Sequence, residues 1–308
     1  CAVLTVAGLS SCQPRQEMPA SSQQAEEDPQ FLADNAQWRQ HRHDSLVGAD
    51  GWTTLVGLHW LSLDAHYVGS GVRSGIRIAK GPDALGLVQQ QGGQVYFTPE
   101  RGVAVTRDGV ALKGRGLLAS DKTPSPTLIG FDEGRGELSL IERGDRKALR
   151  IRHADAEARR SFAGLAFWPA DRGWRIPGRF VAHAPGKTIE IANIVGILEQ
   201  SRNPGVLVFT RDGVDYRLEA LDDGDGRLFV ILADRTSGQG SYSAGRYLDV
   251  DAADAEGRVT LDFNRAYNPP CAFTDFATCP LPPPENRLDL AITAGEKTYA
   301  KPTRTSKE

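Results

Sequence analysis

The sequence predicts a mainly β protein, with antiparallel sheets that form a barrel or a sandwich-like body in one lobe or two, and with one N-terminal helix. Three observations carry this prediction. The 308 residues include 33 glycines and 18 prolines, which indicates many turns and short elements. The apolar runs are short and rich in β-branched and aromatic residues. No amphipathic helical stretch of about 10–15 residues alternates with these runs, which argues against a parallel α/β sheet.

Composition, charge and missing motifs exclude several classes of protein. Charged residues make up 24% and hydrophobic residues 40%, so the chain is neither disordered nor a multi-span membrane protein. Lys and Arg number 36 against 39 Asp and Glu. A general nucleic-acid-binding protein would carry a basic excess, so we expect no nucleic-acid partner. The chain has no Gly-Lys-Ser/Thr phosphate loop, no His-Glu-x-x-His and no Gly-x-Ser-x-Gly, and we expect no cofactor.

The first residues have the pattern of an export signal. Residues 1–12, CAVLTVAGLSSC, are uncharged and apolar or small, which fits a signal-peptide remnant although the run is shorter than the roughly 20 residues of a membrane span. The closing LSSC resembles the bacterial lipobox, whose cysteine, here Cys12, is lipidated. Residues 13–28 are rich in Gln, Glu, Ser and Pro and should form a disordered tether. We therefore expect a lipoprotein anchored through Cys12 to a membrane of the bacterial cell envelope, facing the periplasm or the surface.

A β-rich globular domain over residues 29–308 should follow and begin with a helix. Asp28 is a suitable N-cap and Pro29 a suitable first helical residue. Apolar residues then recur at spacings compatible with one helical stripe, and glycines follow, so we predict a helix over 29–47. The next segment, 51–69, fits both a strand and a helix pattern, and its type stays open.

Short strands are predicted from about residue 70 onward. The pentapeptide TRDGV occurs at 106–110 and at 210–214, and its Asp-Gly pair between apolar runs is typical of a hairpin turn. The repeat indicates either one turn motif used twice or, as the weaker alternative, an internal duplication. Prolines and glycines near 170–180 suggest a boundary between two lobes, or a bend within one β domain.

Polar and aromatic residues gather in one long loop, 264–287, which its prolines should hold in one shape. The residues that we predict to bind a ligand in or near this loop are Arg246, Tyr247, Asn264, Tyr267, Asn268 and Asn286. Arg246 has a favoured structural alternative, an ion pair with Asp234 or Glu296. Candidate catalytic residues are Glu296, Cys271 and His59, although His59 among tryptophans is more typical of a core residue.

Cys271 and Cys279 lie in the same loop, and an even pair in an exported protein predicts a disulfide. The alternatives are a nucleophilic cysteine with His59, His66 or His183 as its base, or two reduced thiols in a core. A Cys-x7-Cys spacing without a nearby histidine is not typical of zinc, and we predict no metal site.

The run DFNRAYNPPCAFTDFATCPLPPPENRL, with AGEK at 294–297, resembles the signature of the domain-of-unknown-function family DUF1684. GWTTLVGLHWL, FAGLAFWP at 162–169 and ADRTSGQGSYSAGRYL at 233–248 are also similar to that family, so the resemblance covers roughly 35–300. It implies a largely β body and no particular activity.

Two hypotheses about function follow. The first is a binding module of the envelope that holds a small molecule or a partner through the loop 264–287. The second is a hydrolase-type enzyme that uses Glu296 or Cys271 in the same loop. Asparagine, tyrosine and arginine bind substrates and ligands alike, so residue types do not separate the two.

Overall fold

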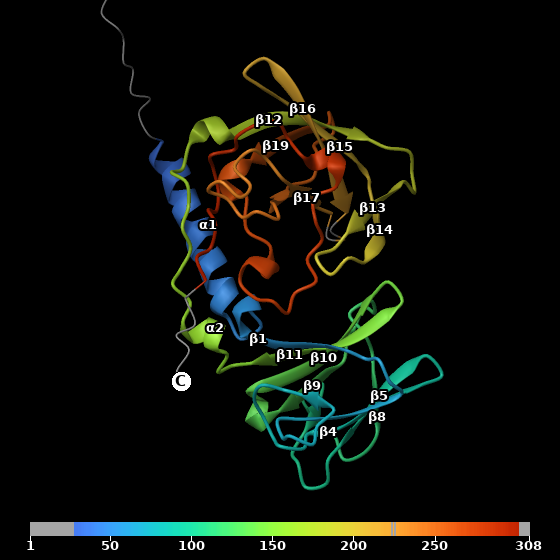
Figure 1. The fold of residues 1–308 in the computed structure, drawn as a ribbon. Helices are drawn as coiled ribbons and strands as arrows, with labels where there is room; N and C mark the ends of the chain where they lie inside the picture. The colour runs from blue at the N-terminus through green and yellow to red at the C-terminus, as the bar shows by residue number, and fades with distance from the viewer. Residues whose placement is uncertain (1–27, 223, 225, 302–308) are drawn as a thin grey trace, which may run out of the picture.

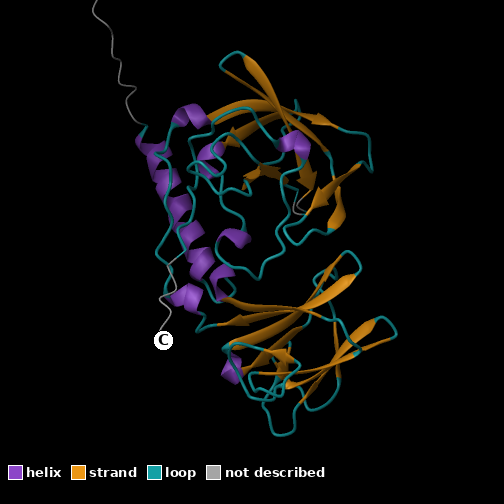
Figure 2. Ribbon diagram, viewed as in Figure 1, coloured by secondary structure: helices purple, strands orange, loops and turns teal. Residues whose placement is uncertain are grey.

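The computed structural model describes residues 28–222, 224 and 226–301. The predicted signal-peptide remnant, Cys12 and the tether up to residue 27 lie outside the described residues. The described chain is mainly antiparallel β structure with one long N-terminal helix, as predicted (Figures 1 and 2). No helix within the described residues is both long and apolar enough to span a membrane.

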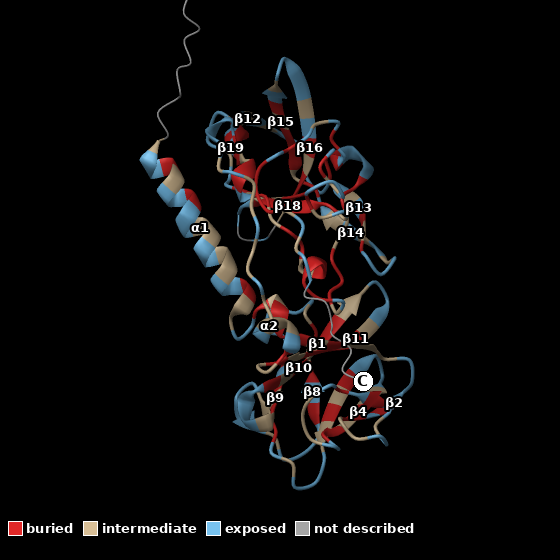
Figure 3. Ribbon diagram, turned by 60° about the vertical axis from the view of Figure 1, so that its left-hand side comes forward, coloured by how far each residue is buried: buried red, intermediate tan, exposed pale blue. Residues whose placement is uncertain are grey.

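The N-terminal helix α1 (Pro29–Val47) has the predicted bounds. Its cap explains why it begins there: the Asp28 carboxylate accepts hydrogen bonds from the backbone N–H groups of Gln30 and Phe31, at 3.0 and 3.3 Å. Figure 3 shows that much of the helix surface is exposed. The buried residues Phe31 and Leu46 lie near its two ends and fix the helix to the rest of the protein.

A first lobe contains the strands β1–β11 in two sheets. Leu138 and Leu149 of one sheet and Val88 and Phe97 of the other meet in one buried cluster, which shows that the core lies between the sheets. The strands pair in an antiparallel manner except for one short parallel contact between β2 and β3, and Ser120 forms an isolated parallel bridge to Leu140. The six-stranded sheet has the order β1 (Leu55–Trp60), β11 (Arg146–His153), β10 (Gly136–Arg143), β9 (Leu128–Phe131), β6 (Thr106–Arg107), β7 (Val110–Ala111). The five-stranded sheet has the order β3 (Ile76–Arg77), β2 (Ala65–Gly69), β4 (Gly86–Gln91), β5 (Gln94–Pro99), β8 (Gly116–Leu118).

A second lobe contains β12–β19 and the C-terminal loops. Its core joins Leu207, Leu218, Val230 and Leu261 with Phe263, just after the last strand. The main sheet has the order β18 (Arg246–Val250), β17 (Leu228–Leu232), β16 (Val214–Asp222), β15 (Gly205–Arg211), β12 (Arg175–Ala182), β19 (Arg258–Asp262). A separate hairpin consists of β13 (Thr188–Ala192) and β14 (Leu198–Arg202).

The connection between the lobes runs from His153 to Arg175 and follows α1 (Figure 1). It contains the short helices α2 (Glu157–Arg160) and η3 (Arg172–Trp174). Arg39 of α1 donates to the backbone oxygen of Trp168 at 2.9 Å, so the helix and the connection are joined directly. The range 170–180, where we predicted a boundary, lies where η3 leads into β12.

The segment 51–69, whose type the sequence left open, is mostly strand. One 3₁₀ turn, η1 (Trp52–Thr54), precedes β1, and β2 follows after a short loop. Both TRDGV segments form tight hairpin turns, because Asp108 and Gly109, and likewise Asp212 and Gly213, have positive φ. One turn joins the short strand β6 to the edge strand β7, and the other joins β15 and β16 inside a sheet. These different positions fit one turn motif used twice.

Candidate functional site

The loop 264–287 packs against the second lobe and is held there by its own side chains. It contains the short helical turns η5 (Pro270–Ala272) and η6 (Pro284–Asn286), and η4 (Phe263–Arg265) leads into it. Tyr267 pairs with Tyr247 of β18 through backbone hydrogen bonds of 2.8 and 2.9 Å. The predicted rigidity of the loop thus rests on pairing with strands as well as on proline.

Two of the predicted asparagines, Asn264 and Asn286, bind the backbone of segments outside this loop. Asn286 accepts from the N–H of Glu219 at 2.7 Å and donates to the carbonyls of Glu219 and Ile231, at 2.9 Å each. Asn264 accepts from the N–H of Asp171 and donates to its carbonyl, both at 2.9 Å. Both asparagines are fully or almost fully buried. Their side-chain amides bind the backbone of segments that are distant in sequence. The amide groups are therefore used in internal hydrogen bonds.

Arg246 forms the internal ion pair that was the alternative to ligand binding. Its Nη2 donates to the Asp234 carboxylate at 2.6 Å, and both side chains are 0% exposed. Further N–H groups bind the backbone carbonyls of Ile292, at 2.9 Å, and of Ala294. These contacts join β18 to the C-terminal segment.

Glu296 is buried and is bonded through both carboxylate oxygens. Oε1 lies 2.8 Å from Nε of Arg42 in α1, and Oε2 accepts from the Asn268 N–H at 2.8 Å. Burial raises the pKa of Glu296, and the neighbouring Arg42 opposes that rise. The Arg42 guanidinium lies over the Tyr267 ring, 4.7 Å from its centroid. Arg42 thus connects Glu296 with Tyr267, and the Glu296 carboxylate is enclosed.

The predicted tyrosines, Tyr247 and Tyr267, also form contacts within the protein. Tyr247 donates its hydroxyl to the carbonyl of Pro280 at 2.9 Å, and burial raises its pKa. The Tyr267 hydroxyl lies 3.3 Å from the Asp249 carboxylate.

Cys271 and Cys279 are free thiols, so the predicted disulfide is wrong for this structure. The two residues are nonetheless in contact, because the Cys271 N–H donates to Sγ of Cys279 at 3.1 Å. Hydrogen bonds from the Cys279 thiol and the Tyr242 hydroxyl lower the pKa of Cys271 to about 7, and the same pairing raises the pKa of Cys279. Both are buried, which matches the alternative of reduced thiols in a core.

None of the histidines proposed as a base forms a described hydrogen bond with Cys271. His183 bonds to Glu219 at 2.8 Å, and His66 accepts from the Leu63 N–H at 3.1 Å. His59 lies in β1 opposite Leu149, and partial burial lowers its pKa. In the part of the chain that the structure describes, no three His, Cys, Asp or Glu side chains are grouped to hold a metal ion.

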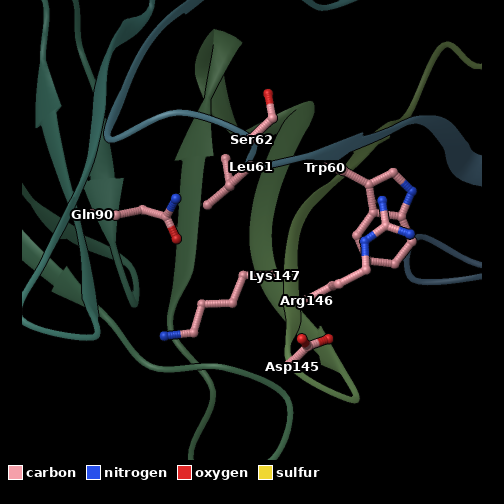
Figure 4. Close-up of a pocket in the computed structure, with 7 residues that line it drawn as sticks. All are labelled: Trp60, Leu61, Ser62, Gln90, Asp145, Arg146 and Lys147. Atoms are coloured by element: carbon pink, nitrogen blue, oxygen red, sulfur yellow. The ribbon is translucent and has the colours of Figure 1, made fainter. Parts of the chain in front are cut away.

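A hollow of about 320 Å³ lies in the first lobe, and no residue of the predicted loop is among the seven that line it (Figure 4). Its walls come from three segments: the end of β1 at Trp60, β4 at Gln90, and the turn and strand start at 145–147. β1 and β11 bring two of these segments together by pairing Trp60 with Ala148. The sheet register therefore builds this hollow from residues up to 87 positions apart.

The hollow combines an aromatic ring with groups of both charges. The Arg146 guanidinium lies over the Trp60 ring, 4.1 Å from its centroid. Lys147 is 3.7 Å from the Glu142 carboxylate and also donates to the Gly93 carbonyl. The Gln90 amide donates to the Leu63 carbonyl at 3.0 Å, which leaves its oxygen as an acceptor.

Asp145 completes the polar lining and is exposed. Its carboxylate has no hydrogen-bond or ion-pair partner among the described residues. A carboxylate, an amide oxygen and two cations thus line a space of a size typical of the smaller ligand sites. No local pattern of the sequence indicated these residues, because only the pairing of distant strands assembles them.

Two larger hollows have poorer linings. One, of about 540 Å³, is lined largely by Ala, Gly and Pro residues near Phe180. The other, of about 580 Å³, lies beside Tyr67 and Val72, which are both exposed. Neither combines an aromatic ring under a stacked guanidinium with an amide, so we take the Trp60 hollow as the candidate site.

Comparisons with known proteins place the second lobe in a family. Residues 160–297 match the model of the family described as Protein of unknown function (DUF1684). The matched range is shorter than the resemblance noted over 35–300, and the segment GWTTLVGLHWL lies outside it. The solution NMR structure of an uncharacterized protein from Haloarcula marismortui is 35% identical, covering 46% of this chain and 79% of that chain, with a TM-score of 0.38. A search of curated proteins gives no match. Through residues 160–297, the chain belongs to the DUF1684 family.

Proposed function

We propose that this protein is a binding protein whose ligand is a small polar molecule held in the Trp60 hollow. The observation that carries the proposal is that Trp60, Arg146, Lys147, Asp145 and Gln90 all line one space of about 320 Å³. Small-molecule sites combine an aromatic or apolar wall with a few polar groups that fix orientation. We first expected the site in the loop 264–287, but the asparagine side chains of this loop are buried and form internal hydrogen bonds.

The lining favours a ligand with both hydrogen-bond donors and acceptors. Asp145 and the Gln90 oxygen accept hydrogen bonds, whereas Arg146 and Lys147 donate them. The indole of Trp60 offers an apolar edge that packs against C–H groups. We therefore propose a neutral or zwitterionic molecule of the size of a monosaccharide or an amino acid.

We also propose that the chain is a lipoprotein held in the cell envelope through Cys12. The support is the apolar run 1–12, the closing LSSC and the polar segment 13–28. Incorporation of labelled palmitate that disappears in Cys12→Ser would support the anchor. Equal labelling of Cys12→Ser would contradict it.

Ligand binding is tested by thermal shift of the full chain against separate panels of monosaccharides and zwitterionic amino acids, followed by calorimetry on any hit. Trp60→Ala should abolish the shift. The matched control is Tyr96→Ala, because Arg115 lies over Tyr96 at 3.8 Å in a similar stacked pair outside the hollow. A hit that survives Trp60→Ala, or no hit in either panel, would contradict the proposal.

The hydrolase hypothesis receives less support from the geometry. Glu296 is 0% exposed and both its oxygens are bonded, so it cannot reach a substrate without breaking the contact with Arg42. Turnover of a bound hit by the unaltered chain would favour the enzyme over the binding protein.

A further inference from the structure

Arg150 is buried on the face of the first lobe that meets the second lobe. It lies in β11 between Leu149 and Ile151, whose side chains belong to the first-lobe core. Successive side chains of a strand point to opposite faces of the sheet, so the Arg150 side chain points away from the first-lobe core.

The surface opposite this side chain belongs to the loop 264–287. Arg143 of β10 donates to the hydroxyl of Thr278 at 2.9 Å, which joins the first-lobe sheet to the loop. Cys279, the next residue, acts electrostatically on Arg150. Arg150 thus lies in the seam between the sheet and the loop, which we call the inter-lobe seam.

The guanidinium of Arg150 has no hydrogen-bond or ion-pair partner among residues 28–222, 224 and 226–301. The residue is only 9% exposed, and its Nε is shielded from solvent without a bond. It lies over the Trp52 ring, with the guanidinium carbon 5.5 Å from the centroid. A buried charge without a partner is strongly destabilising, so this arginine requires an explanation.

The carboxylates near Arg150 are paired with other arginines. Arg143 is paired with Asp121 at 2.7 Å, whereas Arg152 is 3.9 Å from Glu137. Asp50 also acts on Arg152, and no carboxylate lies within ion-pair distance of Arg150 among the described residues. Burial and then repulsion by Arg143 lower the pKa of Arg150 to about 10.

We propose that Arg150 binds an oxyanion, a carboxylate or a phosphate group, in the inter-lobe seam. The planar guanidinium has a fork of N–H donors that matches two oxygens of such a group. Trp52 supports the plane of the guanidinium, and the anion supplies the partner that Arg150 lacks. This inference is independent of the Trp60 hollow and of its proposed ligand.

The first test uses the full chain at constant ionic strength, with phosphate, acetate or chloride as the anion. Phosphate, acetate or both should raise the melting temperature beyond chloride, and calorimetry should give a saturable Kd. Arg150→Met should weaken that binding at least tenfold. Arg77→Met, which removes an exposed strand arginine of the same lobe, should leave it unchanged.

A stability measurement separates binding from a structural role. In chloride alone, Arg150→Met should melt at the same temperature as the unaltered chain or higher, because it removes a buried charge that has no ion-pair partner. A lower melting temperature in chloride together with an unchanged response to phosphate would overturn the proposal. A response to phosphate alone identifies a phosphate-bearing ligand, and a response to acetate identifies a carboxylate.

A second measurement decides the matter if Arg150→Met fails to fold. The Nε–Hε resonance of Arg150, identified through Arg150→Lys, should shift and saturate as phosphate or acetate is added. Arg150→Lys keeps the charge without the fork, and should bind at least tenfold more weakly. A resonance that does not move at millimolar concentrations of either anion overturns the proposal.

Discussion

Arg42, near the start of the chain, and Glu296, near its end, both bind the backbone of Asn268. Arg42 lies 2.8 Å from the Glu296 carboxylate and donates to the Asn268 carbonyl at 2.8 Å. Glu296 accepts from the Asn268 N–H at the same distance. The helix α1, the loop 264–287 and the C-terminal segment are therefore joined at one buried point.

Replacing Glu296 by Gln should break this arrangement. An amide has one accepting oxygen, so either Arg42 or the Asn268 N–H loses its partner in a buried position. We expect the free energy of unfolding in urea to fall by about 3 kcal/mol. Glu285→Gln, at an exposed position of the same loop, should change it by less than about 0.5 kcal/mol. A loss of under about 1 kcal/mol in Glu296→Gln would show that the pair is not important for stability.

Asn286→Ala should destabilise the second lobe. The change removes three hydrogen bonds and leaves backbone groups of Glu219 and Ile231 without their partners. We expect a loss of about 2–4 kcal/mol in the free energy of unfolding, measured by chemical denaturation. Gln200→Ala, at an exposed position of β14, is the control and should lie close to the unaltered chain. Equal stability of the two variants would contradict this role of Asn286.

Asp132 should contribute stability that disappears in acid. The hydrogen bond from His153, at 2.9 Å, lowers the pKa of Asp132 below its ordinary value of 3.8. A lowered pKa stabilises the folded protein above the ordinary value, and this contribution is lost as the pH falls through the lowered one. The stability gap between the unaltered chain and Asp132→Asn should therefore be complete above pH 3.8 and close below it.

Denaturation midpoints recorded from pH 2.5 to pH 7 measure this gap. Asp64→Asn removes an exposed carboxylate of the same lobe, and its curve should run parallel to that of the unaltered chain. A gap in Asp132→Asn that is constant over the range, or that widens in acid, would disprove the role of Asp132.

Cys271 should be the more reactive thiol of the buried pair. Its pKa of about 7 is well below the ordinary 9.0, because the Cys279 thiol and the Tyr242 hydroxyl bond to it. Alkylation of Cys271 should rise with pH around a midpoint near 7, as followed by peptide mass spectrometry. Tyr242→Phe should shift that midpoint upward. Faster alkylation of Cys279, or a midpoint that ignores Tyr242, would refute this assignment.

Local features were predictable from the sequence. Asp28 and Pro29 fixed the start of α1 through a side-chain cap, and the Asp-Gly pairs fixed two hairpin turns through positive φ. Each depends on residues adjacent in the chain, so the sequence pattern contains the whole physical cause.

The role of the asparagines was not predictable in the same way. All six asparagines of the chain are buried: Asn35, Asn193, Asn203, Asn264, Asn268 and Asn286. An amide that clamps a distant backbone and an amide that binds a ligand have the same chemistry, and only burial separates them. Arg246 and Glu296 were misleading for the same reason, since an internal partner satisfies each. The Trp60 hollow lacks any local signal, because strand pairing brings its walls together.

The ion pair of Arg42 and Glu296 also constrains the order of events during synthesis. The two residues are 254 positions apart, which corresponds to roughly 13–50 s of translation at about 5–20 residues per second. The strands β1–β11 find all their sheet partners within residues 55–153, so the first lobe can fold while the ribosome is still making the second. The helix α1 can already bind the segments at Thr53, Arg159 and Trp168, but its contact with Glu296 forms only after the C-terminal segment has been made.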